Sequence, residues 1–286
     1  MVRQDIVNNY DSWYLEVSKL DAQGQPTETK RFGEGQEGEV ANVSNVVWQA
    51  IYRDVSAREM TVPFAVTLHV FDADGQEYYS STVTTTVKDY VVGELVKSSN
   101  TSVTRTLCAD LLNYGAAAQI YFGEHTDNLA NENLSAEAQA ALEEYATKDE
   151  APASLVNGSN GPNIYGSVSV MNRVVLSVSV VGVSGDNVKV RVKNHETGEV
   201  KEDLDTTVSG PVYIAKFANV EADEMRTMFD IVALVDGVET GTPLTWSVEG
   251  YVRAARLSTT VSAEELALFN ALLIYADSAA AFMAEQ

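Results

Sequence analysis

The chain has 286 residues, of which 45% are hydrophobic, so it is long enough for about two folded domains and too apolar for a disordered polymer. Its 19 Lys and Arg residues against 41 Asp and Glu residues give a net charge of −22. Such a surface repels nucleic-acid phosphates and anionic lipid headgroups. The longest apolar runs are short of a membrane span, so we expect neither a nucleic-acid partner nor membrane insertion.

The first half reads as strands followed by a helix. Residues 13–17 and 62–70 predict half-buried strands, because apolar residues recur at every second position. The Asp-Gly pair at 74–75 is typical of a hairpin turn. Further along, one apolar residue follows another at intervals of four, three, four and three residues, which predicts a helix with a single apolar stripe. Its members are Leu107, Leu111, Tyr114, Ala118 and Tyr121.

Residues 126–162 read as a linker, rich in Asn, Gly and Ser, with a short helix near residues 135–146. The second half repeats the order of the first. Residues 174–181 and 229–235 predict strands, Asp236-Gly237 predicts a hairpin, and Ser262 begins a capping box for a closing helix. The stripe of that helix has the same spacing as the first and consists of Leu268, Leu272, Tyr275, Ala279 and Phe282.

An internal repeat is the main organisational signal. Residues 50–64 match residues 215–229 at an offset of 165, and after the hairpin the offset becomes 161. We therefore predict an α+β, mainly β fold with two tandem repeats. Each repeat is expected to be an antiparallel sheet or small β-sandwich capped by a C-terminal helix. The predicted boundaries are 1–125 for the first module, 126–162 for the linker and 163–286 for a diverged second copy.

Two segments carry a family resemblance. Thr86-Val-Lys-Asp-Tyr90 and the helix containing Leu111-Leu-Asn-Tyr-Gly-Ala-Ala-Ala-Gln119 resemble a module that recurs in secreted and surface-attached proteins of gut Clostridia, over residues 44–135. The resemblance implies an extracellular or cell-surface location in a Gram-positive bacterium and further domains in a larger polypeptide. Residues 1–5 lack the apolar core of a signal peptide, so we expect an excised piece with an added Met1.

Several sequence patterns resemble nucleotide, metal or catalytic sites but lack residues that such sites need. Residues 33–38 fit G-x-G-x-x-G but carry Glu34 and Glu37, which repel phosphate. Residues 72–75 have too few oxygen ligands for a calcium loop. The three histidines show no metal-ligand spacing, and Cys108 adjoins the apolar stripe, where a thiol packs as a small hydrophobe. We predict no catalytic residue, no metal site and no cofactor.

Aromatic residues are the remaining binding candidates. Tyr10, Trp13 and Tyr14 cluster near the start, and Tyr78 and Tyr79 follow the first hairpin turn. Such residues anchor protein interfaces and stack on sugars, although they are also common in packed strands. We predict a non-enzymatic adhesion or binding segment of a surface protein, recognising a host protein or a glycan. The alternatives are a structural stalk and an ancillary carbohydrate-binding module of a secreted glycan-degrading enzyme.

Overall fold

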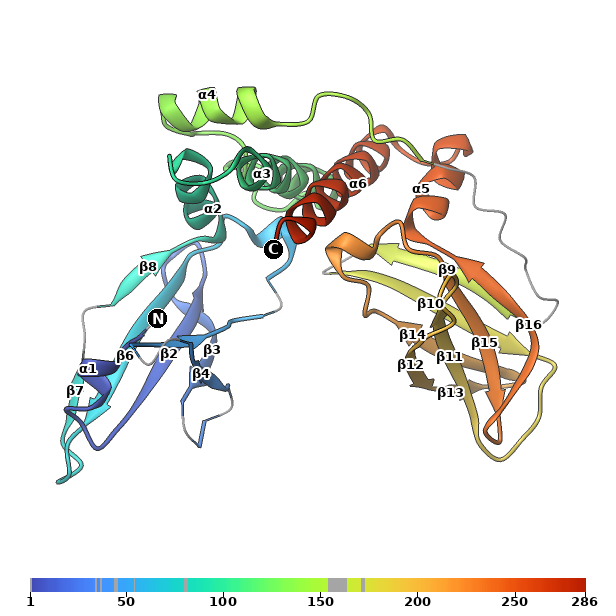
Figure 1. The fold of residues 1–286 in the computed structure, drawn as a ribbon, viewed down its shortest axis with the longest axis horizontal. Coiled ribbons are helices and arrows are strands. Elements are labelled where there is room, and N and C mark those ends of the chain that lie inside the picture. The colour runs from blue at the N-terminus through green and yellow to red at the C-terminus, as the bar shows by residue number, and fades with distance from the viewer. Residues whose placement is uncertain are drawn as a thin grey trace.

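The computed structural model describes residues 2–33, 35–36, 38–43, 46–53, 55–79, 82–153, 164–170 and 173–286. Strands hold 35% of the residues and helices 31%, and the strands of the described residues form four antiparallel sheets, so the expectation of a mainly β chain is confirmed. Figure 1 shows two β-rich units on either side of a gap, both attached to one layer of helices.

The first unit has two sheets. Its larger sheet has the strand order β3-β2-β6-β7, with β8 also paired to β6, and its small sheet has the order β1-β5-β4. Three helices follow, and α2 and α3 both pack against α4. The elements are β1 (Val2–Arg3), α1 (Gln4–Val7), β2 (Ser12–Leu20), β3 (Pro26–Phe32), β4 (Val40–Asn42), β5 (Val47–Ala50), η1 (Ala57–Glu59), β6 (Phe64–Phe71), β7 (Glu77–Tyr79), β8 (Val83–Thr85), α2 (Val87–Val96), α3 (Ser102–Phe122) and α4 (Ala136–Tyr145).

The second unit has two four-stranded sheets of order β13-β14-β10-β9 and β12-β11-β15-β16. Two helices close the chain. The elements are β9 (Ile164–Val170), β10 (Val174–Val181), β11 (Val188–Asn194), β12 (Val200–Asp205), β13 (Thr207–Ser209), β14 (Val212–Phe217), η2 (Ala222–Glu224), β15 (Phe229–Val235), β16 (Val238–Trp246), α5 (Val248–Leu257) and α6 (Ala263–Ala284).

The two sheets of the second unit face each other across one apolar core. In β10 every second residue is buried, as the alternating sequence of this strand predicts. Leu176 and Val178 from β10 share a cluster with Ile231 from β15, and each is at most 1% exposed. Phe217 of β14 packs its ring edge-on against Phe229 at 5.3 Å. This closed two-layer packing defines a β-sandwich.

The helical layer joins the two units. The N-caps of α3 and α6 are Thr101 and Ser262, whose hydroxyls accept from backbone N–H groups in the first turn. The two helices run antiparallel, because Thr101 at the start of α3 donates to Glu285 beyond the end of α6 at 3.2 Å. At the same interface, the Ser278 hydroxyl donates to Asp110, which is 1% exposed. Their contact connects the two units through the helical layer (Figure 1).

Two features of the helices differ from the sequence-based expectation. Each half ends in a short helix and a long one, α2 with α3 and α5 with α6, where one closing helix was expected. The buried side of α3 also extends beyond the predicted stripe: Cys108, Leu112 and Gln119 are buried while Leu111 is only half-buried. The reason is that α3 contacts α2, η1 and α4 as well as α6, so apolar neighbours surround most of it.

Helix α6 is also apolar because several of its residues are buried against neighbouring elements. Judged by length and composition alone, this 22-residue helix could cross a membrane. In this fold Leu268, Leu272 and Leu273 are at most 1% exposed, and Leu272 and Leu273 pack in one cluster with Val174 of the second unit and Tyr114 of α3. The predicted linker also docks in part, since Ala151 is 3% exposed and its carbonyl accepts from Arg256 at 2.8 Å.

Candidate binding surfaces of the first unit

Strand β2 sends the two aromatic residues Trp13 and Tyr14 to opposite faces of the larger sheet, because successive side chains alternate along a strand. Trp13 lies on the inner face, where its ring meets Trp48 edge-on at 5.9 Å and packs against a cluster that includes Leu15 and Val2. The indole of Trp13 therefore belongs to the packing between the two sheets of this unit.

Tyr14 belongs to a row of aromatic residues on the outer face. Strand register places it opposite His69 on β6, and His69 opposite Tyr79 on β7. The Tyr14 ring stacks on His69 at 4.5 Å and 14°, and Tyr79 meets the same imidazole edge-on at 4.9 Å. The guanidinium of Arg31 lies over the Tyr14 ring at 4.9 Å. We call Arg31, Tyr14, His69, Glu77 and Tyr79 the outer aromatic row.

A carboxylate organises this row. Glu77 accepts a hydrogen bond from the Tyr79 hydroxyl at 2.8 Å and lies 2.8 Å from Nδ1 of His69. These two contacts, led by the Tyr79 hydroxyl, lower the pKa of the Glu77 carboxyl below its usual range. His69 is 7% exposed, and among the described residues its buried Nε2 has no hydrogen-bond partner. Tyr79 is 65% exposed, so it is the member of the row that solvent reaches most easily.

The remaining two candidates, Tyr10 and Tyr78, form a separate pair with ring centroids 6.0 Å apart. Tyr78 is 45% exposed, and its hydroxyl donates to Asp72 Oδ2 at 3.3 Å. The other oxygen of Asp72 accepts from the backbone N–H groups of Asp74 and Gln76, which closes the hairpin turn. The structure thus brings the five predicted residues together as three groups: Trp13 with Trp48, Tyr14 with Tyr79, and Tyr10 with Tyr78.

Between its sheets the first unit is open. A groove of about 500 Å³ follows the inner face of the larger sheet and reaches β5. Its floor is mainly apolar and includes Leu15, Val17, Phe32, Tyr52, Phe64 and Val66. Sequence reasoning missed this groove, because alternation along a strand identifies the buried face but not what covers it.

The two segments behind the family resemblance have structural roles. Lys88 is 8% exposed, and its ammonium donates to the carbonyls of Leu129 at 2.9 Å and Glu132 at 2.6 Å. Burial lowers the pKa of this lysine. Gln119 is fully buried and accepts from the Ala130 N–H at 2.7 Å while donating to Thr61 at 3.0 Å. Both side chains hold the segment after α3 against the helices.

Other chemistry-bearing groups are engaged or buried. Burial raises the pKa of the Cys108 thiol to about 11, so at neutral pH it is not the thiolate that nucleophilic chemistry requires. His195 lies 2.9 Å from Asp230 in a strand-end contact. Within the residues that the structure describes, no three His, Cys, Asp or Glu side chains form a cluster suited to a metal ion. Residues 34 and 37 of the glycine-rich stretch lie outside the described residues.

No family model matches this chain, and no curated protein shows significant similarity to it.

Proposed function

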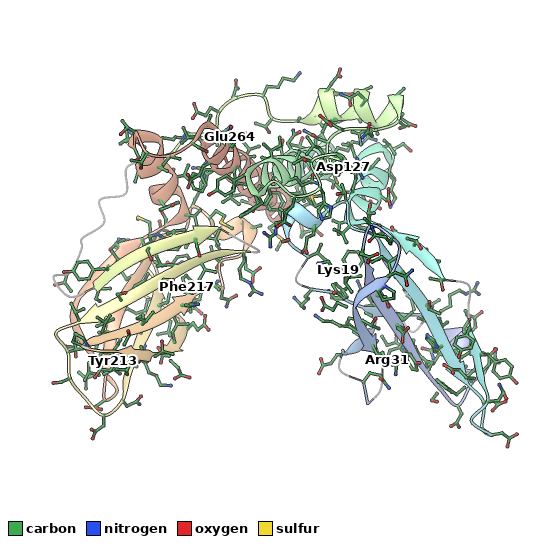
Figure 2. All side chains as sticks on the ribbon, turned by 180° about the vertical axis from the view of Figure 1, so that it is seen from behind. Lys19, Arg31, Asp127, Tyr213, Phe217 and Glu264 are labelled. Carbon is green, nitrogen blue, oxygen red and sulfur yellow. The ribbon has the colours of Figure 1, made fainter. Side chains whose placement is uncertain are left out.

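We propose that the chain is a non-enzymatic binding segment of a bacterial cell-surface or secreted protein, and that it recognises a host protein through the outer aromatic row. The observation that carries this proposal is the exposed Tyr79 ring at one end of the outer aromatic row, which crosses four strands of an antiparallel sheet and has Arg31 over Tyr14 at its other end. Tyr and Arg are the residue types that most often dominate the energy of protein interfaces. Figure 2 shows Arg31 on this sheet at a distance from the helical layer, whereas Lys19 lies closer to that layer.

A protein partner fits this surface better than a glycan. Sugar rings stack on an open aromatic face. The Tyr14 ring is stacked on His69 and lies under the guanidinium of Arg31, so it is not an open platform. The row instead combines an aromatic centre with the charged groups Glu77 and Arg31, as interfaces with a polar rim do. A chain of net charge −22 further favours a partner with a basic surface.

We also propose that the two units descend from one duplicated module, with boundaries near 1–125 and 163–286 and a connecting segment between them. The same order of elements in both units supports this: η1, β6, α2 and α3 in the first, and η2, β15, α5 and α6 in the second. The resemblance to modules of surface proteins supports the extracellular location.

Titration of a captured partner tests the proposed interface. Proteins from mucus or serum that bind the immobilised chain are identified, and the affinity of each is measured with the unchanged chain and with Tyr79→Ser. Tyr165→Ser is the matched control, because Tyr165 is a strand residue 56% exposed in the other unit. We expect Tyr79→Ser to weaken binding at least tenfold, as loss of an interface anchor does, and the control to retain it. Equal affinities for all three chains refute the placement of the interface.

A spacer function is the second candidate, and the antiparallel contact of α3 with α6 favours it. The helical layer lies between the two β units and connects them (Figure 1). A spacer binds no partner, so failure of both mucus and serum proteins to bind the immobilised chain selects this alternative.

A further inference from the structure

The outer faces of corresponding sheets in the two units carry different side chains. In the first unit His69 has a tyrosine opposite it on each neighbouring strand. The residue 165 positions later in the second unit is Leu234, and the residues opposite it are Lys189 and Glu239. The second unit is therefore charged at the places where the first unit has its outer aromatic row.

The carboxylate on this face of the second unit has its counter-charges within the same unit. Glu239 on β16 pairs with Lys193 at 2.7 Å and with Arg191 at 3.5 Å, both from β11. Strand β15 lies between β11 and β16, so these side chains meet across it, and its Leu234 is only 6% exposed.

The first unit lacks these cations. Strand register places Glu16 where the second unit has Arg191, and Ser18 where it has Lys193. The carboxylate of the row belongs to Glu77, and among the described residues no lysine or arginine forms an ion pair with it. A carboxylate on this face is thus neutralised by a cation in one unit and not in the other.

Glu77 is charged and open to a further partner. Its contacts with the Tyr79 hydroxyl and then with His69 lower the pKa of its carboxyl, so the group is ionised at neutral pH. Its side chain is 30% exposed. An ionised carboxylate can accept about four hydrogen bonds, so these contacts leave it able to accept more.

The other end of the row shows how this surface holds a guanidinium. Arg31 lies 4.9 Å over the Tyr14 ring and pairs with Glu16 at 3.0 Å. An aromatic face and an adjacent carboxylate bind such a group together, through a cation–π contact and charge-assisted hydrogen bonds. Tyr79 and Glu77 present the same pair of groups. The Tyr79 ring is 65% exposed, and within the described part of the chain no cation lies over it.

We propose that the Tyr79 end of the row binds an arginine side chain of the partner, with the guanidinium over the Tyr79 ring and hydrogen-bonded to Glu77. This inference rests on the proposed function and names the chemical group that the interface recognises. Arginine suits the place better than lysine, because its planar group stacks on a ring while donating hydrogen bonds in its own plane. The net charge of −22 also attracts a basic partner over longer distances.

Two small compounds test the recognition of arginine on the full chain. The probe is N-acetyl-arginine amide, and the control is N-acetyl-citrulline amide, which has nearly the same shape without the charge. Tyrosine ring signals of the ¹³C-labelled chain are followed by NMR, and the Tyr79 signal is the one that Tyr79→Phe removes. At equal concentration we expect the arginine compound to shift this signal at least about threefold more than the citrulline compound, because only a cation adds a cation–π contact. Tyr90, which is 69% exposed on α2, should show no such ratio.

Two matched variants assign the effect to the carboxylate. Glu77→Gln keeps the shape of the side chain and removes its charge, so we expect the preference for arginine at Tyr79 to disappear. Glu239→Gln makes the same change in the second unit and should leave the preference unchanged. Equal shifts by both compounds on the unchanged chain, equal preference at Tyr90, or a preference that persists in Glu77→Gln overturns the proposal.

The result is separable from that for the interface as a whole. If Tyr79→Ser weakens binding of a captured partner while both compounds shift Tyr79 equally, the interface stands and the recognition of arginine is wrong. If arginine is preferred at Tyr79 but no mucus or serum protein binds the immobilised chain, the recognition chemistry stands and the proposed function is wrong.

Discussion

Tyr114 of α3 and Tyr275 of α6 stack on each other with ring centroids 5.5 Å apart and ring planes within 6°. They are the corresponding residues of the two apolar stripes, 161 positions apart, and the helices that carry them are antiparallel. A contact between corresponding residues in an antiparallel pair has the geometry of a two-fold interface, as between identical subunits. This relationship supports the proposed duplication and places the tyrosine pair at the centre of the contact between the units.

Alkaline unfolding measures the burial of this pair. Burial, together with the neighbouring Tyr275, raises the pKa of Tyr114 to about 12, against about 10 in an unfolded chain. The neutral phenol is the form that the folded state favours. Its contribution to stability is complete below pH 10 and is lost as the pH rises from about 10 to about 12.

We therefore expect Tyr114→Phe to reduce the loss of unfolding free energy between pH 9 and pH 11, as measured by urea denaturation. Part of the loss remains, because burial also raises the pKa of Tyr275. At pH 8 the variant retains the stability of the unchanged chain within about 1 kcal/mol, since the ring and its packing are kept. A pH profile identical to that of the unchanged chain contradicts the prediction.

Gly115 and Gly93 both lie in helices, but we expect their replacement by alanine to change the stability of the chain in opposite directions. A Cβ at Gly115 overlaps the sulfur of Met60 and lies 3.0 Å from the Ala130 Cβ, so Gly115→Ala forces these neighbours apart. Overpacking of this kind costs about 1–3 kcal/mol. A Cβ at Gly93 in α2 meets nothing within 4 Å, and there alanine stabilises the helix by about 0.5–1 kcal/mol. Thermal melting should therefore move down for the first variant and up for the second.

Much of this fold follows from local patterns in the sequence. The alternation in residues 174–181 is visible as β10, and the four-three spacing through Leu268 and Leu272 is visible as α6. These patterns are local consequences of the strand and helix periods. Helix α2 has no such clear stripe, because its buried side includes Lys88, whereas α5 buries Val248, Val252 and Ala255 at intervals of four and three residues.

The candidate surfaces depended on information that local patterns do not carry. The adjacency of Trp13 and Tyr14 in the sequence suggested one cluster, but the strand period sends them to opposite faces of the sheet. His69 lies between Tyr14 and Tyr79 only through the register of three strands. Register joins residues that are far apart in sequence, and a single sequence contains no direct record of it.

Arg226 offers a test of the junction at the second unit. Its guanidinium pairs with Asp277 of α6 through two bonds of 2.5 and 2.7 Å, with Glu249 at 2.8 Å, and with the Pro152 carbonyl at 2.7 Å. The Glu249 side chain is only 11% exposed, so Arg226→Met leaves a largely buried carboxylate with a lost partner. We expect a loss of about 2 kcal/mol in unfolding free energy, below the range for fully buried pairs because Arg226 is 29% exposed.

The matched control for this change is Arg3→Met. Arg3 also pairs with an aspartate, Asp5 at 2.7 Å, but its side chain is 72% exposed. Pairs in open solvent contribute little, so chemical denaturation should shift by less than about 0.5 kcal/mol. If both variants lose a similar amount of unfolding free energy, the partly buried network around Arg226 contributes no more to stability than an exposed ion pair.

Gln119 tests whether the segment of α3 behind the family resemblance has a structural role, because its side-chain amide is fully buried and both its oxygen and its nitrogen make hydrogen bonds. Its oxygen accepts from the Ala130 N–H, and its nitrogen donates to Thr61 and, at 3.2–3.3 Å, to the carbonyls of Asn128 and His125. Gln119→Leu keeps an uncharged side chain that fills part of the same space but leaves the buried Ala130 N–H without its acceptor. A buried donor left unpaired costs about 1–3 kcal/mol, and the segment from His125 to Ala130 should exchange its amide hydrogens faster.

The corresponding position in α6 is Ala280, which is exposed, and Ala280→Gln should therefore leave stability unchanged within about 0.5 kcal/mol. If Gln119→Leu melts at the same temperature as the unchanged chain and the exchange of residues 125–130 is not accelerated, the buried amide does not hold this segment in place.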